Sequence, residues 1–220
     1  GRLIVFAPTP EVIYPCGQPA VRIEPGPIAT VLEGRTRPTH FAGVCQVVLT
    51  LMHLTAPRWA LFGRKDAQQL AIIESMVRDL AVPLEIVPVD IRRENDGLAM
   101  SSRNAYLSPE QRHQALALSR ALQAGQDAAA QATGSRPDPV AIRQTALASL
   151  EAADGVEVDY VALVAPDSFE DLAGAGLGLP RSEPVGEDKE EGLPAVGLLA
   201  VAARVGTTRL IDNTLIDLRP

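Results

Sequence analysis

The sequence predicts an α/β fold for the first half of the chain and a smaller α+β unit for the second half. In the first half, a strand, a helix and another strand follow one another within about thirty residues, from Trp59 to Val89, which is the spacing of a βαβ unit with a parallel sheet. In the second half, two apolar runs flank Gly206-Thr207-Thr208 as the strands of an antiparallel hairpin do. With 220 residues, 46% of them hydrophobic and 21% charged, the chain can bury a sizeable core.

The elements of the first half follow from the spacing of apolar residues and from the prolines that interrupt it. Val44, Val47, Val48 and Leu51 recur at helical spacing until Pro57 stops the pattern. Short runs rich in β-branched and aromatic residues indicate strands. We therefore expect a buried strand over 3–6, a connection with short extended pieces as far as Gly34, a helix from Val44, a short buried strand over 59–62, a helix over 70–80 and a strand over 84–89.

The helices of the second half are marked by the residues that open them. Ser108, Pro109 and Gln111 supply an N-cap, a first-turn proline and a capping-box partner, so a long alanine-rich helix should follow. Asp138 and Pro139 open another helix in the same way. Beyond it we expect a helix end at Gly155, a half-buried strand over 158–164, an exposed loop over 165–197 that is acidic over 183–191, and strands over 198–204 and 209–216.

Charge and cysteine content restrict the classes of function. A net charge of −7 argues against a broad basic face for nucleic acid. The two cysteines, Cys16 and Cys45, form no CxxC pair and no disulfide framework, which fits a reducing cytoplasm. The apolar runs are far too short to span a bilayer and no signal-peptide pattern opens the chain. We therefore expect a soluble, cytoplasmic protein without nucleic-acid or membrane partners.

Three polar clusters lie where predicted elements meet, which is where sites on α/β sheets usually form. The first cluster, EGRTRPTHFAGV, runs from Glu33 to Val44. It is either a loop before a helix, with Thr39 as the N-cap and His40 as a satisfied surface group, or a part of a binding pocket.

The second cluster, FGRKDAQQ over 62–69, has the parts of a phosphate site. Gly63 lets the backbone turn tightly, the helix N-terminus offers free N–H groups to an anion, and Lys65 adds a mobile positive charge. The alternative is a simple capping box formed by Asp66 and Gln69, and both interpretations can hold at one helix end. The Walker pattern, GxxxxGK followed by Ser or Thr, is absent from the sequence.

The third cluster, DGLAMSSRN over 96–104, places two hydroxyls and a guanidinium in succession. Such a run can clamp a triphosphate through hydroxyl and bidentate arginine hydrogen bonds. The same string also suits a turn followed by a strand edge. Its position after a βαβ unit favours ligand binding.

Read in order, EGRTRPTHFAGV, FGRKDAQQL and DGLAMSSRNAYLSPEQR resemble the signature blocks of the pantothenate synthetase family, and GTTRLIDN resembles that family's terminal hairpin. The resemblance covers nearly the whole chain apart from 165–197. It implies the latter part of a Rossmann-like, nucleotidyltransferase-type domain over 1–91 and a small, lid-like α+β domain over 92–220. It also implies a homodimeric, ATP-dependent ligase that condenses pantoate with β-alanine through a pantoyl adenylate, with release of pyrophosphate and AMP.

The resemblance implies a role for each matched residue. Catalysis would be mostly positioning, because adenylation needs positive charge on the departing polyphosphate and no protein nucleophile. By matched position, Lys65, Ser101, Ser102 and Arg103 would hold the ATP phosphates, the backbone at Phe62, Gly63 and Met100 would cradle the adenosine, Asp66 would help to position the nucleotide or its Mg²⁺, Gln69 would bind pantoate, and Glu33, Arg37 and His40 would build the substrate pocket and the adjoining subunit contact.

The sequence also departs from the family pattern. The family begins with a segment that carries an HxGH motif, whose histidines stabilise the triphosphate, and a later loop supplies another glutamine for pantoate. Neither is present, since no two of the three histidines lie three residues apart. Arg64 stands where the family usually has Glu, and Ala67 where an aromatic residue is common. Because the chain begins at Gly1 without Met, we expect an incomplete copy of an active ligase, the alternatives being an inactive remnant or one piece of a split enzyme.

Overall fold

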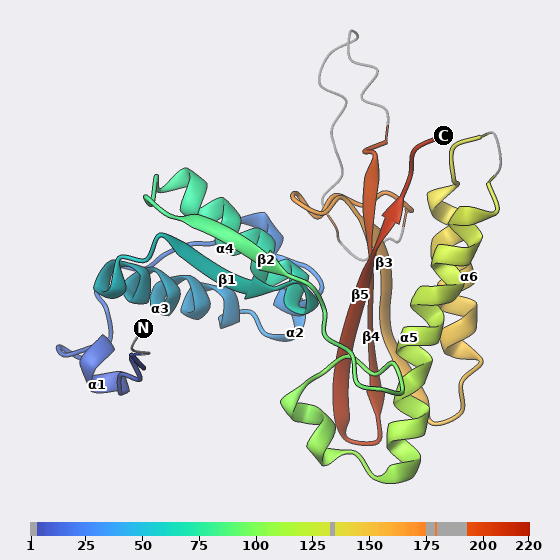
Figure 1. Ribbon diagram of the computed structural model, residues 1–220, viewed down its shortest axis with the longest axis horizontal. Coiled ribbons are helices and arrows are strands. Elements are labelled where there is room, and N and C mark those ends of the chain that lie inside the picture. The colour runs from blue at the N-terminus through green and yellow to red at the C-terminus, as the bar shows by residue number, and fades with distance from the viewer. Residues whose placement is uncertain (1–3, 133–134, 175–178, 180–192) are drawn as a thin grey trace, which may run out of the picture.

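Two separate sheets organise the chain (Figure 1). The structure is a computed structural model that describes residues 4–132, 135–174, 179 and 193–220. The first part contains a two-stranded parallel sheet and the second part a three-stranded antiparallel sheet. This mixed α/β architecture agrees with the predicted fold class. Among the described residues, no helix combines the length and the apolar character needed to cross a membrane.

The parallel sheet is the predicted βαβ unit. Strands β1 (Trp59–Gly63) and β2 (Glu85–Val89) pair in parallel along their whole lengths. The chain passes between them through a short 3₁₀ turn, η2 (Arg64–Asp66), and helix α4 (Ala67–Asp79). Helix α3 (His40–Thr55) lies beside α4, and the two helices form one apolar core with the sheet.

Strand β1 is partly buried on one face and exposed on the other, so the expectation of a buried strand is wrong. Ala60 and Phe62 pack against the core that α3 and α4 share. The alternate residues Trp59 and Leu61 lie on the other face, and Leu61 is 66% exposed. Successive side chains of a strand point to opposite faces, and within the described residues both helices contribute to the core on the same face.

The segment before α3 differs most from the expectation. Residues 4–6 form no strand, and Ile4 is 87% exposed. An apolar run becomes a strand only where a partner strand accepts its hydrogen bonds, and this segment lies apart from both sheets (Figure 1). The expected extended pieces are instead short helical turns: α1 (Pro10–Ile13), η1 (Pro27–Thr30) and α2 (Glu33–Thr36).

The antiparallel sheet has strand order β3-β4-β5, and its three strands match the predicted ones. Strand β3 (Val156–Val164) pairs with β4 (Val196–Val205), which continues into β5 (Thr208–Asp217) through a tight turn. Gly206 has a φ of 56°, a left-handed conformation that glycine adopts without steric cost. The turn therefore confirms the hairpin expected from the Gly-Thr-Thr sequence.

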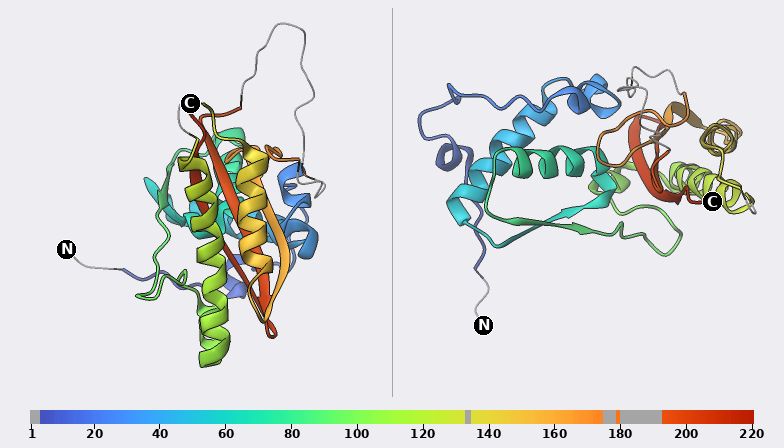
Figure 2. Two further views of the ribbon diagram at one scale, coloured as in Figure 1. Left: turned by 90° about the vertical axis from the view of Figure 1, so that its right-hand side faces the viewer. Right: turned by 90° about the horizontal axis from the view of Figure 1, so that it is seen from above.

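Helices α5 (Pro109–Ala130) and α6 (Pro139–Glu151) cover one face of this sheet (Figure 2). Helix α5 begins with the predicted capping box, in which the Ser108 hydroxyl accepts from the Gln111 N–H and the Gln111 side chain accepts from the Ser108 N–H. At α6, the Asp138 side chain accepts from the second residue of the helix. Local sequence therefore determines where both helices begin.

The opposite face of the antiparallel sheet packs against the first part of the chain. Tyr160 and Ala162 of β3 join a second core with Val31, Leu32 and Phe169. Strand β3 is thus buried on both faces from Tyr160 onward, not half-buried as expected. Because Phe169 fills this core, the expectation of an exposed loop over 165–197 is wrong for its first residues. The acidic stretch 183–191 lies outside the described residues.

Candidate functional site

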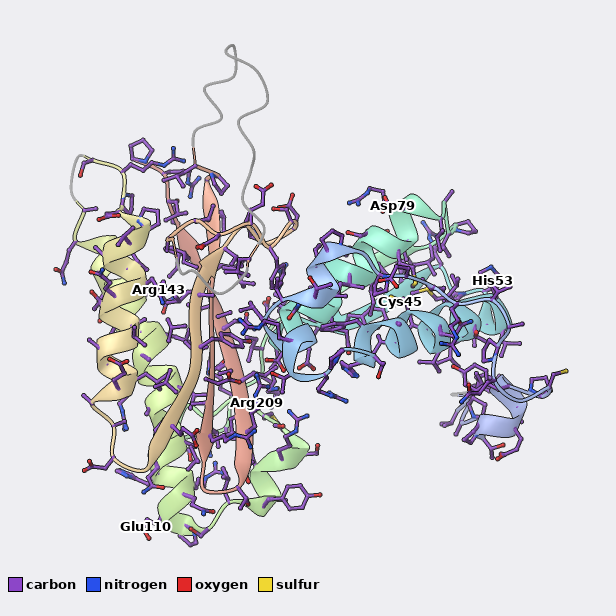
Figure 3. All side chains as sticks on the ribbon, turned by 180° about the vertical axis from the view of Figure 1, so that it is seen from behind. Cys45, His53, Asp79, Glu110, Arg143 and Arg209 are labelled. Carbon is purple, nitrogen blue, oxygen red and sulfur yellow. The ribbon has the colours of Figure 1, made fainter. Side chains whose placement is uncertain are left out.

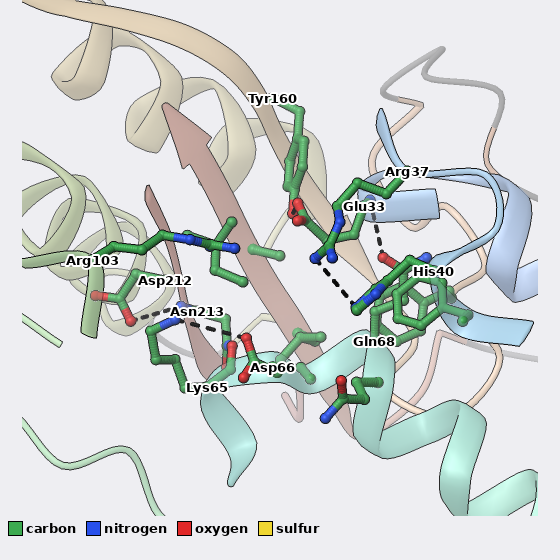
Figure 4. Close-up of a pocket in the computed structure, with 17 residues that line it drawn as sticks. Glu33, Arg37, His40, Lys65, Asp66, Gln68, Arg103, Tyr160, Asp212 and Asn213 are labelled. Atoms are coloured by element: carbon green, nitrogen blue, oxygen red, sulfur yellow. Dashed lines mark hydrogen bonds and ion pairs between the residues drawn. The ribbon is translucent and has the colours of Figure 1, made fainter. Parts of the chain in front are cut away.

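A small recess lies between the two sheets (Figure 4). Its walls come from the segment that leads into α3, from the turn between β1 and α4, from the third polar cluster and from β4 and β5. The cavity volume is about 60 Å³. A volume of this size holds a carboxylate or one phosphoryl group and not a whole nucleotide, because sites for such ligands measure about 300–1,000 Å³. Seven sequence-predicted site residues line it: Glu33, Arg37, His40, Lys65, Asp66, Gln69 and Arg103.

Lys65 reaches the recess from the turn between β1 and α4. Its side chain is 18% exposed, and its Nζ lies 3.7 Å from a carboxylate oxygen of Asp66. The Asp66 side chain makes no capping hydrogen bond to α4, so the capping-box alternative for Asp66 and Gln69 is not what the structure has. The first residues of α4 line the recess beside Lys65, which places a helix N-terminus and a cation at the same wall.

Arg37 and His40 form a second polar pair, on the wall that leads into α3. Nη1 of Arg37 lies 3.3 Å from Nε2 of His40. Because a guanidinium only donates, Nε2 must accept, and the imidazole is neutral with its proton on Nδ1. Burial, followed by the charge of Arg37, lowers the pKa of His40. Thr39 makes no side-chain capping hydrogen bond, contrary to the local interpretation of this cluster.

Glu33 joins α2 to the antiparallel sheet, and its carboxylate is not left free at the recess. Both of its carboxylate oxygens accept from Arg209 at 2.7 Å, and the Tyr160 hydroxyl donates to one of them at 3.0 Å. Burial lowers the pKa of Arg209, but hydrogen bonds and charge from Glu33 and Asp159 outweigh this and raise it. Burial and the nearby Glu33 charge raise the pKa of Tyr160. The structure therefore shows a joining role for Glu33, while its contact with substrate stays a prediction.

Gln68 supports Glu33 and was missed by the sequence analysis. Its Oε1 accepts from the Glu33 N–H, and its Nε2 donates to the carbonyls of Ile28 and Val31. The backbone here is strained, since Leu32 is buried with a φ of 45°. No local pattern distinguishes Gln68 from its neighbour Gln69, because its partners lie 35 to 40 residues earlier.

The third cluster is only partly in the recess. The Arg103 side chain extends toward it (Figure 4), and its guanidinium makes no hydrogen bond or ion pair with the described residues. Ser101 accepts from the Arg103 N–H and so shapes the start of η3 (Ser102–Tyr106). Three of the proposed ligands in this cluster, Met100, Ser101 and Ser102, do not line the recess.

The loop that carries Arg103 is tied to both α5 and β5. Arg112 of α5 donates to Glu94 and Asp96, with distances of 2.7 Å and 2.9 Å. Arg93 makes a two-point ion pair with Asp212 of β5, at 2.6 Å and 3.1 Å. These contacts hold the loop against the antiparallel sheet.

The recess is electropositive once internal pairs are counted. Glu33 is paired with Arg209 and Asp212 with Arg93, which leaves Arg37, Lys65 and Arg103 against the single carboxylate of Asp66. An anion is therefore the ligand that the recess favours. Figure 3 shows Arg209 on the antiparallel sheet, on the side that faces the first part of the chain.

The backbone groups predicted to contact the adenosine at Phe62 and Gly63 lie outside the recess. Phe62 and Gly63 end β1 and pair with Pro88 and Val89, and neither lines the cavity. Within the part of the chain that the structure describes, no cluster of three or more metal-ligating side chains occurs. A single carboxylate, such as that of Asp66, fits the mode in which Mg²⁺ uses one protein carboxylate and takes its remaining ligands from phosphates and water.

Comparison with known proteins gives one family. The family described as pantoate-beta-alanine ligase matches residues 1–215. A pantothenate synthetase from a Nocardioides species is 49% identical over 213 residues, which cover 97% of this chain and 57% of that protein. Pantothenate synthetase 4 from Frankia alni is 51% identical over 210 residues, which cover 96% of this chain and 60% of that protein. The chain thus spans about three-fifths of the length of these relatives.

Solved structures agree with this result. The crystal structure of pantothenate synthetase from Thermus thermophilus matches with a TM-score of 0.80 and 39% identity, over 98% of this chain and 69% of that one. A pantoate-beta-alanine ligase from Francisella tularensis, complexed with beta-gamma ATP and beta-alanine, matches with a TM-score of 0.60 and 28% identity. That match covers 93% of this chain and 61% of the other.

Proposed function

The chain belongs to the pantoate-beta-alanine ligase family, and on that premise we propose that its protein joins pantoate to β-alanine at the expense of ATP. The pantoate carboxylate attacks the α-phosphorus of ATP, and pyrophosphate leaves. The amine of β-alanine then attacks the acyl carbon of the pantoyl adenylate, and AMP leaves with the formation of pantothenate. Neither step needs a nucleophile from the protein, so the chain's contribution is positioning and charge.

The observation that carries this proposal is the meeting of Lys65, Arg103 and Gln69 at one electropositive recess. Lys65 and Arg103 come from different segments and approach the same space. Two cations suit the charge that develops on pyrophosphate as it departs. The neutral amide of Gln69 suits the hydroxyl and carboxylate groups of pantoate, and no hydrogen bond within the described residues occupies it.

The remaining roles are assigned by matched position. In the proposal, Ser101 and Ser102 donate to the phosphates, and the backbone at Phe62, Gly63 and Met100 lies against the adenosine. Asp66 holds Mg²⁺, which when bound adds positive charge to the phosphates. Arg37 and His40 complete the substrate wall. The division into domains at 91 and 92, a homodimer and a cytoplasmic location belong to the same proposal.

A chimera tests the function without depending on where this chain begins. The matched region of the Nocardioides relative is replaced by this chain, so that the rest of the relative supplies every group outside the match. We expect AMP release that requires pantoate, β-alanine and Mg-ATP together, and loss of that release in the chimera with Lys65→Ala. A folded but inactive chimera, beside an active parent relative, would overturn the proposal. Analytical ultracentrifugation of the same preparation tests the homodimer.

A further inference from the structure

Two consecutive residues of β5 contact two of the segments that bring cations to the recess, those of Lys65 and Arg103. Asp212 and Asn213 are buried, with 4% and 5% of their surfaces exposed. Consecutive side chains of a strand point to opposite faces. Asp212 and Asn213 can therefore reach two different parts of the chain from one rigid strand.

Asn213 reaches the turn between β1 and α4. Its Nδ2 donates to the carbonyl oxygen of Arg64 at 3.0 Å and to that of Lys65 at 2.9 Å. Both amide hydrogens of Asn213 are used, and they bind two successive peptide groups. Since the Lys65 side chain leaves from the second of these residues, Asn213 determines the direction in which that side chain starts.

Asp212 reaches the loop that precedes Arg103. Its two carboxylate oxygens accept from the two terminal nitrogens of Arg93, and Arg93 also donates to the Gly97 carbonyl. The Asn104 side chain continues the connection, because it donates to Glu94 and to the Ala99 carbonyl of the same loop. Asp212 therefore fixes the base of the loop whose far end presents Arg103.

We infer that Asp212 and Asn213 are positioning residues, Asn213 for Lys65 and Asp212 for Arg103, which set the distance between these two cations. The inference rests on the proposed function, in which both cations bind the polyphosphate of ATP. Two cations that act on one polyphosphate must be held at a set separation, and a strand inside a sheet holds them better than two loops do. Lys65 and Arg103 touch the ligand, and Asp212 and Asn213 act through them.

A purely adhesive role is the alternative, in which Asp212 and Asn213 only hold the two sheets together. Coupling between mutations separates the two roles. When one residue acts through another, the double variant loses less binding than the product of the two single fold-losses. Positioning predicts a crossed pattern: Asn213 couples with Lys65 and not with Arg103, whereas Asp212 couples with Arg103 and not with Lys65. A purely adhesive role predicts that Asp212 and Asn213 variants lose stability whichever cation is also replaced, and that the binding losses show no crossed pattern.

The experiment is isothermal titration of inorganic tripolyphosphate and of ATP into the chimera of this chain with the Nocardioides relative. The single variants are Asn213→Ala, Asp212→Asn, Lys65→Ala and Arg103→Ala, with all four crossed doubles. Asn213→Asp, which keeps the shape and removes both donors, serves where the alanine variant unfolds. Thr214→Ala is the matched control: the Thr214 hydroxyl, on the same strand, accepts from Gln126 of α5, and no side-chain hydrogen bond within the described residues joins Thr214 to the segments of Lys65 or Arg103.

We expect Asn213→Ala to weaken tripolyphosphate binding about 5- to 10-fold, the range for one or two lost positioning hydrogen bonds, and Lys65→Ala to weaken it more. The double variant should bind no more weakly than Lys65→Ala alone. Additive losses, or a loss from Thr214→Ala as large as that from Asn213→Ala, would overturn the inference and leave the proposed function standing. If the unaltered chimera does not bind, or if Lys65→Ala binds as tightly as the unaltered chimera, the assignment of Lys65 fails and the inference fails with it.

Discussion

Arg209 of β5 donates two hydrogen bonds of 2.7 Å to Glu33 of α2, which lies 176 residues earlier in the sequence. Their side chains are only 13% and 14% exposed. Asp159 and Tyr160 of β3 complete the network around this pair. The contact joins the first part of the chain to the antiparallel sheet at the edge of the recess.

Replacing Arg209 with lysine should destabilise the protein even though the charge is retained. Lysine cannot donate to both oxygens of Glu33 in a planar fork, so one carboxylate oxygen and Asp159 lose their donors. We expect a loss of about 2–3 kcal/mol in the free energy of unfolding, somewhat below the range for breaking a fully buried pair. Urea denaturation measures it. Arg78→Lys, at the exposed Arg78–Asp79 pair, is the control and should cause no measurable change.

Replacing Lys65 should remove adenylation and leave the fold intact. Lys65→Met keeps the apolar stem, which matters because the side chain is largely buried. Loss of one cation at the departing polyphosphate should cost about 2–4 kcal/mol at the transition state. Pantoate-dependent exchange between ATP and pyrophosphate in the chimera, beside a melting curve, measures the two effects separately. Unchanged exchange in Lys65→Met would contradict the assignment.

The neighbouring glutamines should behave in opposite ways. Gln68→Ala removes the partner of the Glu33 N–H and of the Ile28 carbonyl, while the Val31 carbonyl keeps the Gly34 N–H, so we expect a loss of about 2–4 kcal/mol in stability. Gln69→Ala should leave the melting temperature unchanged and weaken the use of pantoate more than that of ATP. Separate substrate titrations of the chimera decide the second point. An equal loss for both substrates would show that Gln69 does not select pantoate.

Stability should fall as the pH falls because of His40. Its pKa in the folded protein lies below the usual value of 6.5, so the unfolded chain takes up the proton first. The stabilisation from neutral His40 is therefore present above 6.5 and is lost as the pH drops from 6.5 toward the lower folded value. Urea denaturation from about pH 7.5 to about pH 5.5 measures this dependence. His40→Gln should flatten it and His113→Gln, at an exposed position, should not; a profile unchanged by His40→Gln would contradict the prediction.

The elements that could be predicted are those whose signals are local. The capping box at Ser108, the N-cap at Asp138 and the hairpin at Gly206 each depend on residues a few positions apart. The order of strand, helix and strand gave the parallel sheet for the same reason. Burial was less predictable. Leu61 is exposed and Phe169 is buried because what covers a residue comes from elsewhere in the chain.

The sequence by itself determined the family, the order of the elements and the chemical types at the recess, including the cations Lys65 and Arg103. Only the tertiary structure decided which of two residues adjacent in sequence makes which contact. Both glutamines line the recess, but Gln68 is bonded to the backbone of Ile28, Val31 and Glu33 and Gln69 makes no hydrogen bond within the described residues. Asp212 and Asn213 likewise hold different segments, although each pair is adjacent in sequence. The physical reason is that one step along a helix or strand turns a side chain to another side, and the partner found there comes from a part of the chain that is distant in sequence.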